Sequence, residues 1–519
     1  MLRKQLRSLP ATLPQTYERI LLNIEENYSQ YVSKMLQWLT YSKWPLSLLQ
    51  LAEVVAIDED EDPRFDPERR FPDPEDILLM CSSLVTATVE EDYPLWDVSR
   101  QVNTVREVRV KLAHFSVKEY LVSSQIMNGE ARKYSIHEID ANVRIARDCL
   151  SYILYFTEDI PKPAWNEEDE FWSDFSLAQY AAQQWQEHAE VGGQINEELM
   201  MDLIMELFTS DGNAFSSWCL SKLGSGNSHT PLTYASTMGL LGVVRRLIIM
   251  GVDVNASSGP RGNALCVASF IGHTEIVKLL LEMGADPNSL KHGWTHGSPV
   301  YWASSKGHGA IVRLLLDAGA EIGLETGVAC HSALHAAAWS GNTSIVVMLI
   351  SSGMDVNLNP RGTLSLTNYA LSRASWQNHD EVVKLLVEAG ADPDSKIAAL
   401  HIASRLGLDK IVEVLLGAGA DLNRGWQSAS PLREAVEYGY PTTVKILLDA
   451  GADADLGGSW DKNCFYRFDN SDKFFANTKD RREVLDLLAA AGAEIIDLEE
   501  MMKELKDETE KTRYRSKTI

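Results

Sequence analysis

The sequence predicts a mainly α-helical protein in which an α-solenoid of short repeats follows a separate N-terminal module. The first observation is a five-residue motif, Gly-Val-Asp-Val-Asn at Gly251, that returns with variation at Gly284, Gly319, Gly353, Gly390, Gly419, Gly451 and Gly492. The second is its spacing of 33, 35, 34, 37, 29, 32 and 41 residues, a mean of about 34. A regular period of this size indicates repeats that bury their apolar faces on their neighbours.

Each repeat carries the signals of two short helices. The second helix is an apolar run at helical spacing, such as residues 276–281, and the motif glycine ends it in the left-handed conformation. The first helix begins at segments such as Thr230-Pro231 and Ser298-Pro299, where a hydroxyl caps the helix and proline takes its first position.

These helix starts and this period resemble ankyrin repeats, whose first helix opens on the pattern TPLHxA. The resemblance implies about eight ankyrin repeats over residues 228–496, each with a projecting finger loop. The 29-residue interval before Gly419 predicts a shortened finger in the sixth repeat, and the 41-residue interval before Gly492 predicts a longer one in the eighth.

Charge and composition exclude several classes of function. The net charge is −25, of which residues 1–227 contribute −18 and residues 228–496 contribute −6. A strongly acidic half repels phosphate backbones, so we expect no nucleic-acid partner. No apolar run reaches the roughly 18 residues of a membrane span. Six widely spaced cysteines without a CxxC pair indicate reduced thiols and a cytoplasmic protein.

The N-terminal module is expected to begin with three helices, residues 13–27, 31–41 and 48–57. An acidic loop from Asp58 to Asp76 should be solvated and mobile, and a short helical stretch at residues 76–84 should follow. Residues 84–89 and 108–112 alternate like the strands of a hairpin. Helices followed by a hairpin is a winged-helix order, so we predict a winged-helix domain at 1–125, a helical connector at 126–227 and a charged tail at 497–519.

Four segments of this module resemble the winged helix of fungal NACHT–ankyrin proteins, which are NOD-like signal-transduction ATPases. They read LPATLPQTYERIL, MLQWLTYSKWPLSLLQLAEVVAID, ILLMCSSLV and VKLAHFSVKEYLVS. The same winged helix is often labelled after GPI inositol-deacylase. Residues 149–154 and 175–188 resemble that family's helical connector.

The sequence departs from that family in its nucleotide site. The phosphate-binding loop GxxxxGK followed by Ser or Thr does not occur, so we expect no nucleotide cofactor. The chain begins where the family's NACHT domain would end, which fits a truncated gene, a mis-predicted start or a free-standing adaptor. An in-frame phosphate-binding loop upstream of Met1 would favour the truncated ATPase.

Other candidate catalytic or metal-binding residues have simpler structural interpretations. No GxSxG motif is present, so the deacylase label brings no lipase chemistry. His292 and His296 are four residues apart but lack a neighbouring Cys or acidic ligand, and Cys330 and His331 are adjacent residues that rarely point together. His335 and His401 occupy the TPLH position and His114 follows the second strand, so we expect all three to be structural. We therefore expect no enzyme and no metal.

The finger loops supply the predicted partner-binding residues. Three fingers carry tryptophans, and exposed tryptophan is typical of interface hot spots. The predicted set is Trp294, Trp426 and Trp460, with a polar rim of Arg424, Gln427, Lys291 and Asp461. The alternative is that each ring packs sideways against the neighbouring finger.

The sequence therefore predicts a non-enzymatic scaffold or adaptor that binds a protein partner through its fingers and concave face. The resemblance implies a NACHT-type ATPase domain as a second partner, contacted by the winged helix around Leu49, Val54 and Val55. One alternative is the C-terminal sensor part of a fungal NOD-like NTPase. Another, a winged-helix transcription factor, needs a basic third helix, whereas residues 48–57 contain Glu53 and neither Lys nor Arg.

Overall fold

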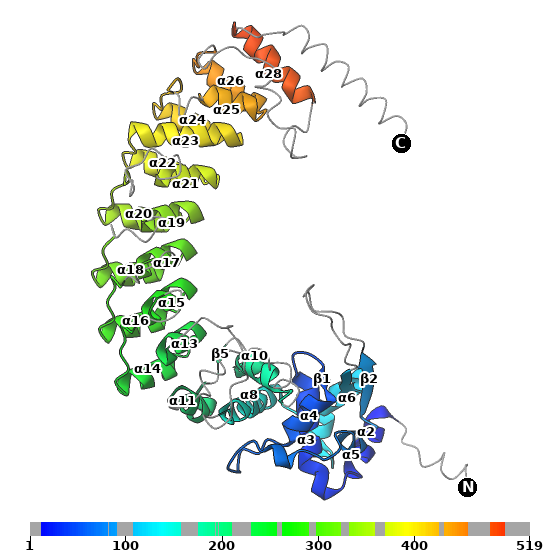
Figure 1. The fold of residues 1–519 in the computed structure, drawn as a ribbon. Helices are drawn as coiled ribbons and strands as arrows, with labels where there is room; N and C mark the ends of the chain where they lie inside the picture. Colours follow the sequence, from blue (N-terminus) through cyan, green and yellow to red (C-terminus); the bar gives the residue numbers. More distant parts are fainter. Residues whose placement is uncertain are drawn as a thin grey trace, which may run out of the picture. The chain divides into compact units, whose positions relative to one another are not determined.

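The computed structural model (Figure 1) forms two compact units, residues 1–235 with 240–252 and residues 236–239 with 253–519. The residues that it describes are 12–80, 83–90, 107–156, 175–191, 194–195, 197–209, 230–256, 262–289, 297–322, 332–358, 369–424, 430–454 and 478–493. Within these ranges, no helix combines the length and the apolar character that crossing a membrane requires.

The first unit opens with three helices, α2 (Leu13–Leu22), α3 (Ser29–Tyr41) and α4 (Leu48–Val55). The hydroxyl of Thr12 caps α2, and Ser47 and Gln50 cap α4 reciprocally. A 3₁₀ turn, η1 (Glu26–Tyr28), separates α2 from α3, so the first helix is shorter than predicted. A second 3₁₀ turn, η2 (Pro67–Arg69), precedes α5 (Asp76–Met80).

A three-stranded antiparallel sheet follows these helices. Its strands are β1 (Leu46–Ser47), β2 (Val85–Glu90) and β3 (Glu107–Leu112), in the order β1-β3-β2. The predicted hairpin is confirmed, with Val85 opposite Leu112. β1 was not predicted, because two residues are too few to show alternation. The winged-helix domain and its NACHT-associated class both remain predictions.

The helices after the sheet form the rest of the first unit. They are α6 (Phe115–Leu121), α7 (Ser124–Asn128), η3 (Arg132–Tyr134), α8 (Glu138–Leu154), α10 (Ala178–Ala189), η4 (Glu197–Met200), α11 (Met201–Thr209), α13 (Pro231–Met238, the last residues of which group with the second unit) and α14 (Leu241–Ile249). A short ribbon, β4 (Glu190–Val191) and β5 (Gln194–Ile195), follows α10. α8 and α10 pack along each other, and α3 packs against α8.

Buried polar groups join these helices. The indole N–H of Trp38 donates to Asp148 over 2.8 Å, and Lys34 pairs with the same carboxylate at 2.8 Å. His188 bonds Tyr180 at 2.7 Å and Asn142 at 2.8 Å. These four side chains, Trp38, Asp148, Tyr180 and His188, therefore have hydrogen-bond partners inside the core.

The acidic segment after α4 is anchored to the fold, so the expectation of a freely solvated loop is wrong at its centre. Phe65 is fully buried, with its ring centroid 4.4 Å from that of Tyr152. Glu59 forms an ion pair with Arg147 at 2.6 Å. The composition signalled solvation, but one aromatic side chain buries enough apolar surface to hold the segment in place.

The predicted contact face on α4 is also corrected. Val54 and Val55 lie in the core, and only Leu49 is exposed. Glu53 is buried as well, accepting from the Tyr152 hydroxyl and the Leu177 backbone N–H, each over 2.7 Å. The connector therefore covers Glu53 on α4, and the fold leaves neither valine exposed to a partner.

The second unit is a stack of helix pairs. The pairs are α15 (Ala264–Ile271) with α16 (Thr274–Glu282), α17 (Pro299–Lys306) with α18 (Gly309–Asp317), α19 (Ala333–Ser340) with α20 (Thr343–Ser351), α21 (Ala370–Trp376) with α22 (Asp380–Glu388), α23 (Pro393–Leu406) with α24 (Asp409–Gly417), and α25 (Pro431–Glu437) with α26 (Pro441–Asp449). α28 (Thr478–Ala490) packs on α26. First helices contact first helices of the next pair, and second helices contact second helices (Figure 1).

The recurring motif has a structural task between repeats. The side chain of Asn255 donates to the Gly284 carbonyl over 3.2 Å and accepts from the Asp286 N–H over 2.8 Å. Asn288, Asn357 and Asn423 occupy the same motif position in later repeats, and each makes the same pair of hydrogen bonds to the repeat that follows it. The motif asparagine therefore ties the turn of one repeat to the turn of the next.

The sixth repeat confirms the predicted short finger. α23 begins at Pro393, three residues after Gly390, and runs for 14 residues, against eight for α17. The carboxylate of Asp392 caps it by accepting from the Ser395 N–H over 2.6 Å. The missing finger is replaced by extra turns at the start of the helix. The predicted long finger of the eighth repeat lies outside the described residues.

Candidate protein-interaction face

The candidate site is the side of the first helices that neither the second helices nor the core covers. In each first helix a buried alanine, such as Ala303 or Ala374, faces the stack. The side chains two or three residues after this alanine, and Trp302 and Arg373 one residue before it, are half-buried or exposed. We call the side chains at these positions the first-helix ridge: Phe270, Trp302, Lys306, Trp339, Arg373, Trp376 and Arg405.

At the start of the ridge, aromatic rings and a cation from α15 and α17 pack together. The rings of Phe270 and Trp302 meet edge to face, with centroids 5.2 Å apart. The ammonium of Lys306 lies 4.7 Å from the centroid of Phe270. Such edge-to-face and cation–π contacts stabilise the pair of helices by a fraction of a kcal/mol to about 1 kcal/mol each.

Further along, cations continue to lie over rings of the neighbouring repeat. The guanidinium of Arg373 is 5.3 Å from the ring centroid of Trp339, and that of Arg405 is 5.1 Å from Tyr438 on α25. Trp339 and Trp376 remain 42% and 41% exposed, which leaves one side of each indole open to a partner. Such half-exposed tryptophans beside arginine have the composition of interface hot spots.

The ridge is positively charged on an otherwise acidic protein. Its cations are Lys306, Arg373 and Arg405, and the ridge positions of α15 to α23 hold no carboxylate, whereas the whole chain carries −25. Burial lowers the pKa of Arg373, but a guanidinium stays protonated in proteins. The face therefore offers apolar surface and positive charge.

Most of the predicted finger residues cannot be compared with this face. Trp294, Lys291, Trp426, Gln427, Trp460 and Asp461 lie outside the described residues, as do His292, His296, Cys330 and His331. Arg424 is described, and it forms an exposed ion pair with Asp394 at the start of α23, at 2.8 Å. Arg424 therefore contacts the start of the sixth repeat's first helix, and its place in a binding rim stays a prediction.

The three remaining histidines have structural contacts. His401 is buried and its Nε2 bonds the Arg424 carbonyl at 3.3 Å, as predicted for this position, and burial lowers its pKa to about 4. The ring of His335 bonds the hydroxyl of Ser332 at 2.8 Å. His114 caps α6 by accepting from the Ser116 N–H over 3.2 Å.

The ridge was not predicted from the sequence, although four repeats carry a signal for it. Phe270, Trp339, Trp376 and Arg405 each stand two residues before the left-handed residue that follows the first helix. Thr237, Ser305 and Glu437 occupy this position in other repeats, so the pattern is confined to part of the stack.

A family model confirms the nature of the stack. The model for ankyrin repeats, which describes three copies, matches residues 242–326, 265–360, 302–397 and 371–457. Residues 242–457 are ankyrin repeats. The ankyrin stack is a protein–protein interaction module, because its helices are buried on their neighbours and its exposed faces serve for recognition.

Two known proteins are similar to the chain. The azaphilone pigments biosynthesis cluster protein L of Monascus ruber is 33% identical over 303 residues, which cover 54% of this chain and 61% of that relative. The chain thus matches less than two thirds of that relative's length. The crystal structure of the human ASB11 ankyrin repeat domain is 29% identical, covers 43% of this chain and 99% of that domain, and superposes with a TM-score of 0.38.

Proposed function

We propose that this protein is a non-enzymatic scaffold that binds a protein partner along the first-helix ridge of its ankyrin stack. The observation that carries the proposal is the exposure of Trp339 and Trp376 on either side of Arg373. A tryptophan ring can bury on the order of 200 Å² against a partner, enough for a hot spot of a few kcal/mol. The ring of Trp339 is held by Arg373 of the next repeat, which reduces the ordering entropy that opposes binding.

The chemistry of the ridge favours a partner segment with acidic and apolar side chains. Carboxylates would pair with Lys306, Arg373 and Arg405, and apolar side chains would cover the open indole faces. The acidic remainder of the chain repels the same segment elsewhere, which directs it to this face. The predicted fingers could extend this contact, with Trp294, Trp426 and Trp460 at its edge.

A second proposal concerns the N-terminal module. Its order of helices and hairpin, together with the resemblance to fungal NACHT–ankyrin proteins, favours contact with a NACHT-type ATPase domain, in trans for an adaptor or in cis for the sensor part of a longer NTPase. Only Leu49 of the predicted contact residues is exposed, so this contact would need other surface.

We propose a cytosolic location, which the free, buried thiols of Cys149 and Cys266 support.

The ridge proposal is tested by quantitative affinity capture from the source organism with three matched baits. The baits are the native chain, a Trp339→Ala/Trp376→Ala double variant, and a Val347→Ala control, which alters an equally exposed apolar side chain on α20. We expect specific proteins to be captured by the native and control baits and lost at least tenfold from the double variant. A capture profile that is identical for all three baits contradicts the proposal.

A further inference from the structure

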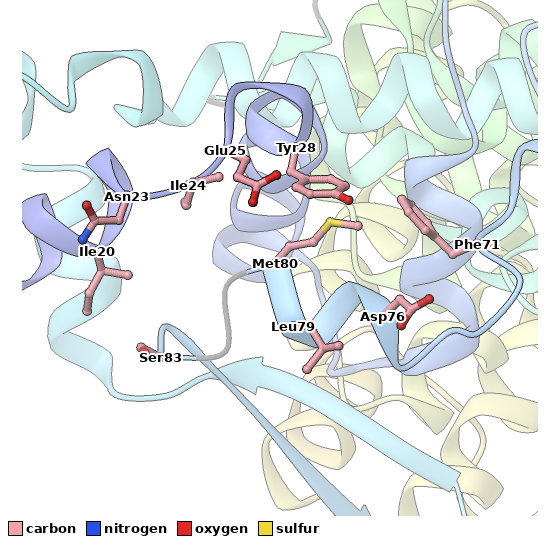
Figure 2. A pocket seen from close by; sticks show the side chains of 10 residues that line it. All are labelled: Ile20, Asn23, Ile24, Glu25, Tyr28, Phe71, Asp76, Leu79, Met80 and Ser83. Atoms are coloured by element: carbon pink, nitrogen blue, oxygen red, sulfur yellow. The ribbon is translucent and has the colours of Figure 1, made fainter.

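A groove on the first unit lies outside the ankyrin repeats and opens between α2 with its following turn and α5 (Figure 2). Its volume is about 540 Å³, within the range of about 300–1,000 Å³ that is typical of ligand sites. Side chains from α2 and η1 line one side, and side chains of α5 and the segment before it line the other. The lining residues used below are Ile24, Glu25, Tyr28, Phe71, Asp76 and Leu79.

The apolar part of the groove is unusually open to solvent. Leu79 on α5 is 74% exposed and Tyr28 on η1 is 38% exposed. The ring of Phe71 meets the ring of Tyr31 edge to face, with centroids 5.6 Å apart. Leu79 on one side of the groove and Tyr28 on the other therefore present apolar surface that the described residues leave uncovered.

The charge around the groove has one sign. Glu25 and Asp76 are exposed lining residues, and the lining contains neither Lys nor Arg. No ion pair of Glu25 or Asp76 occurs within the described ranges, whereas the adjacent Glu26 is paired with Lys133 at 2.8 Å. Asp73 and Glu75 extend the acidic rim just before α5. The groove therefore combines an apolar floor with carboxylates on two opposite edges.

We propose that this groove binds a basic amphipathic segment of a partner protein. Apolar side chains of the segment pack against Ile24, Phe71 and Leu79, and lysines or arginines on its flanks pair with Glu25 and Asp76. This pattern matches helix-in-groove recognition, in which one apolar stripe supplies the anchors. Carboxylates on both edges fix the orientation of such a segment and repel an acidic one. The proposal is independent of the first-helix ridge, which suits an acidic partner.

The binding test uses the full chain and three fluorescent twelve-residue peptides. One has an apolar stripe of leucines with lysines on the other face, one has the same leucines with glutamates, and one has the same lysines with serines. Measured by fluorescence anisotropy at about 0.15 M salt, the leucine–lysine peptide should bind at least tenfold more tightly than either of the others, and more weakly as salt is raised.

Variants locate the binding. Leu79→Ser should weaken binding of the leucine–lysine peptide about tenfold, and the double variant Glu25→Lys/Asp76→Lys should weaken that binding further. All three residues are exposed, so the variants should keep the native fold. Ile139→Ser, at a residue 56% exposed on α8, and Glu119→Lys on α6 are the matched controls and should leave binding within twofold. Circular dichroism melts verify that each variant is folded.

Several results would overturn the proposal. Equal binding of the leucine–glutamate peptide would mean that the acidic rim selects nothing. Equal binding of the serine–lysine peptide would mean that the acidic chain attracts any cation without the groove. Loss of binding in the control variants, or full retention in both groove variants, would place the peptide elsewhere.

Discussion

The guanidinium of Arg373 on α21 lies over the indole ring of Trp339 on α19, with 5.3 Å between its central carbon and the ring centroid. The two residues are 34 positions apart in the chain and lie in successive repeats. The contact therefore joins successive repeats on the face that we propose for partner binding. It holds Trp339 in position while Trp376, one helical turn after Arg373, stays open.

The first prediction separates binding from stability on the ridge. Trp376→Ala should change the free energy of unfolding by no more than about 0.5 kcal/mol, because the side chain is 41% exposed. It should weaken binding of a ridge partner by tenfold or more, about 1.4 kcal/mol. Calorimetric melts and titration with the partner check both numbers. A melting temperature lowered by several degrees would mean that the ring packs within the stack.

The second prediction concerns the glycine that ends α15. Gly272 has φ +106°, and a Cβ there would lie 2.6 Å from the ring of His308 in the next repeat. Gly284 has φ +86° and no atom within 4 Å of such a Cβ. Both alanine substitutions suffer backbone strain of about 1 kcal/mol, and only Gly272→Ala adds a clash. In urea unfolding, Gly272→Ala should therefore have a lower free energy of unfolding than Gly284→Ala. Equal losses of stability in the two variants would show that the His308 ring moves aside.

The third prediction is a pH dependence from His401. Burial lowers the pKa of His401 from 6.5 to about 4 in the folded chain. The unfolded chain thus binds a proton first as pH falls, and stability is lost between about pH 6.5 and pH 4, by up to roughly 3 kcal/mol. His401→Gln should be less stable at pH 7 and should lose stability less steeply over that window. If the free energy of unfolding changes with pH to the same extent in both proteins, His401 is not the source of the pH dependence.

The fourth prediction concerns the helix that replaces the sixth finger. Asp392→Ala removes the carboxylate that caps α23 and should destabilise the start of that helix by about 1 kcal/mol. Hydrogen exchange should quicken at residues 394–397 and stay unchanged in α17, whose cap is Ser298. Exchange that quickens equally along the whole stack would mean that the cap acts on global stability alone.

The repeats could be read from the sequence because their determinants are local. A capping residue, a left-handed glycine and an apolar run recur within each 34-residue unit, so the signal is repeated and each copy supports the others. The short sixth finger followed from chain length alone, since Gly390 and Gly419 are too close for a full loop. The helices of the N-terminal module were found for the same reason, with ends misplaced by a few residues where side-chain caps decide the boundary.

What the sequence by itself determined was therefore the mainly helical repeat architecture, the first-helix and second-helix pattern and the acidic N-terminal half. Only the tertiary structure decided which surfaces are open. Glu53 and Phe65 contact Tyr152, which lies 99 and 87 residues further along the chain, and Trp339 meets Arg373 in the next repeat. Burial depends on contacts between distant segments, which local periodicity does not encode, so a side chain on a predicted helix could face a core or a partner equally well.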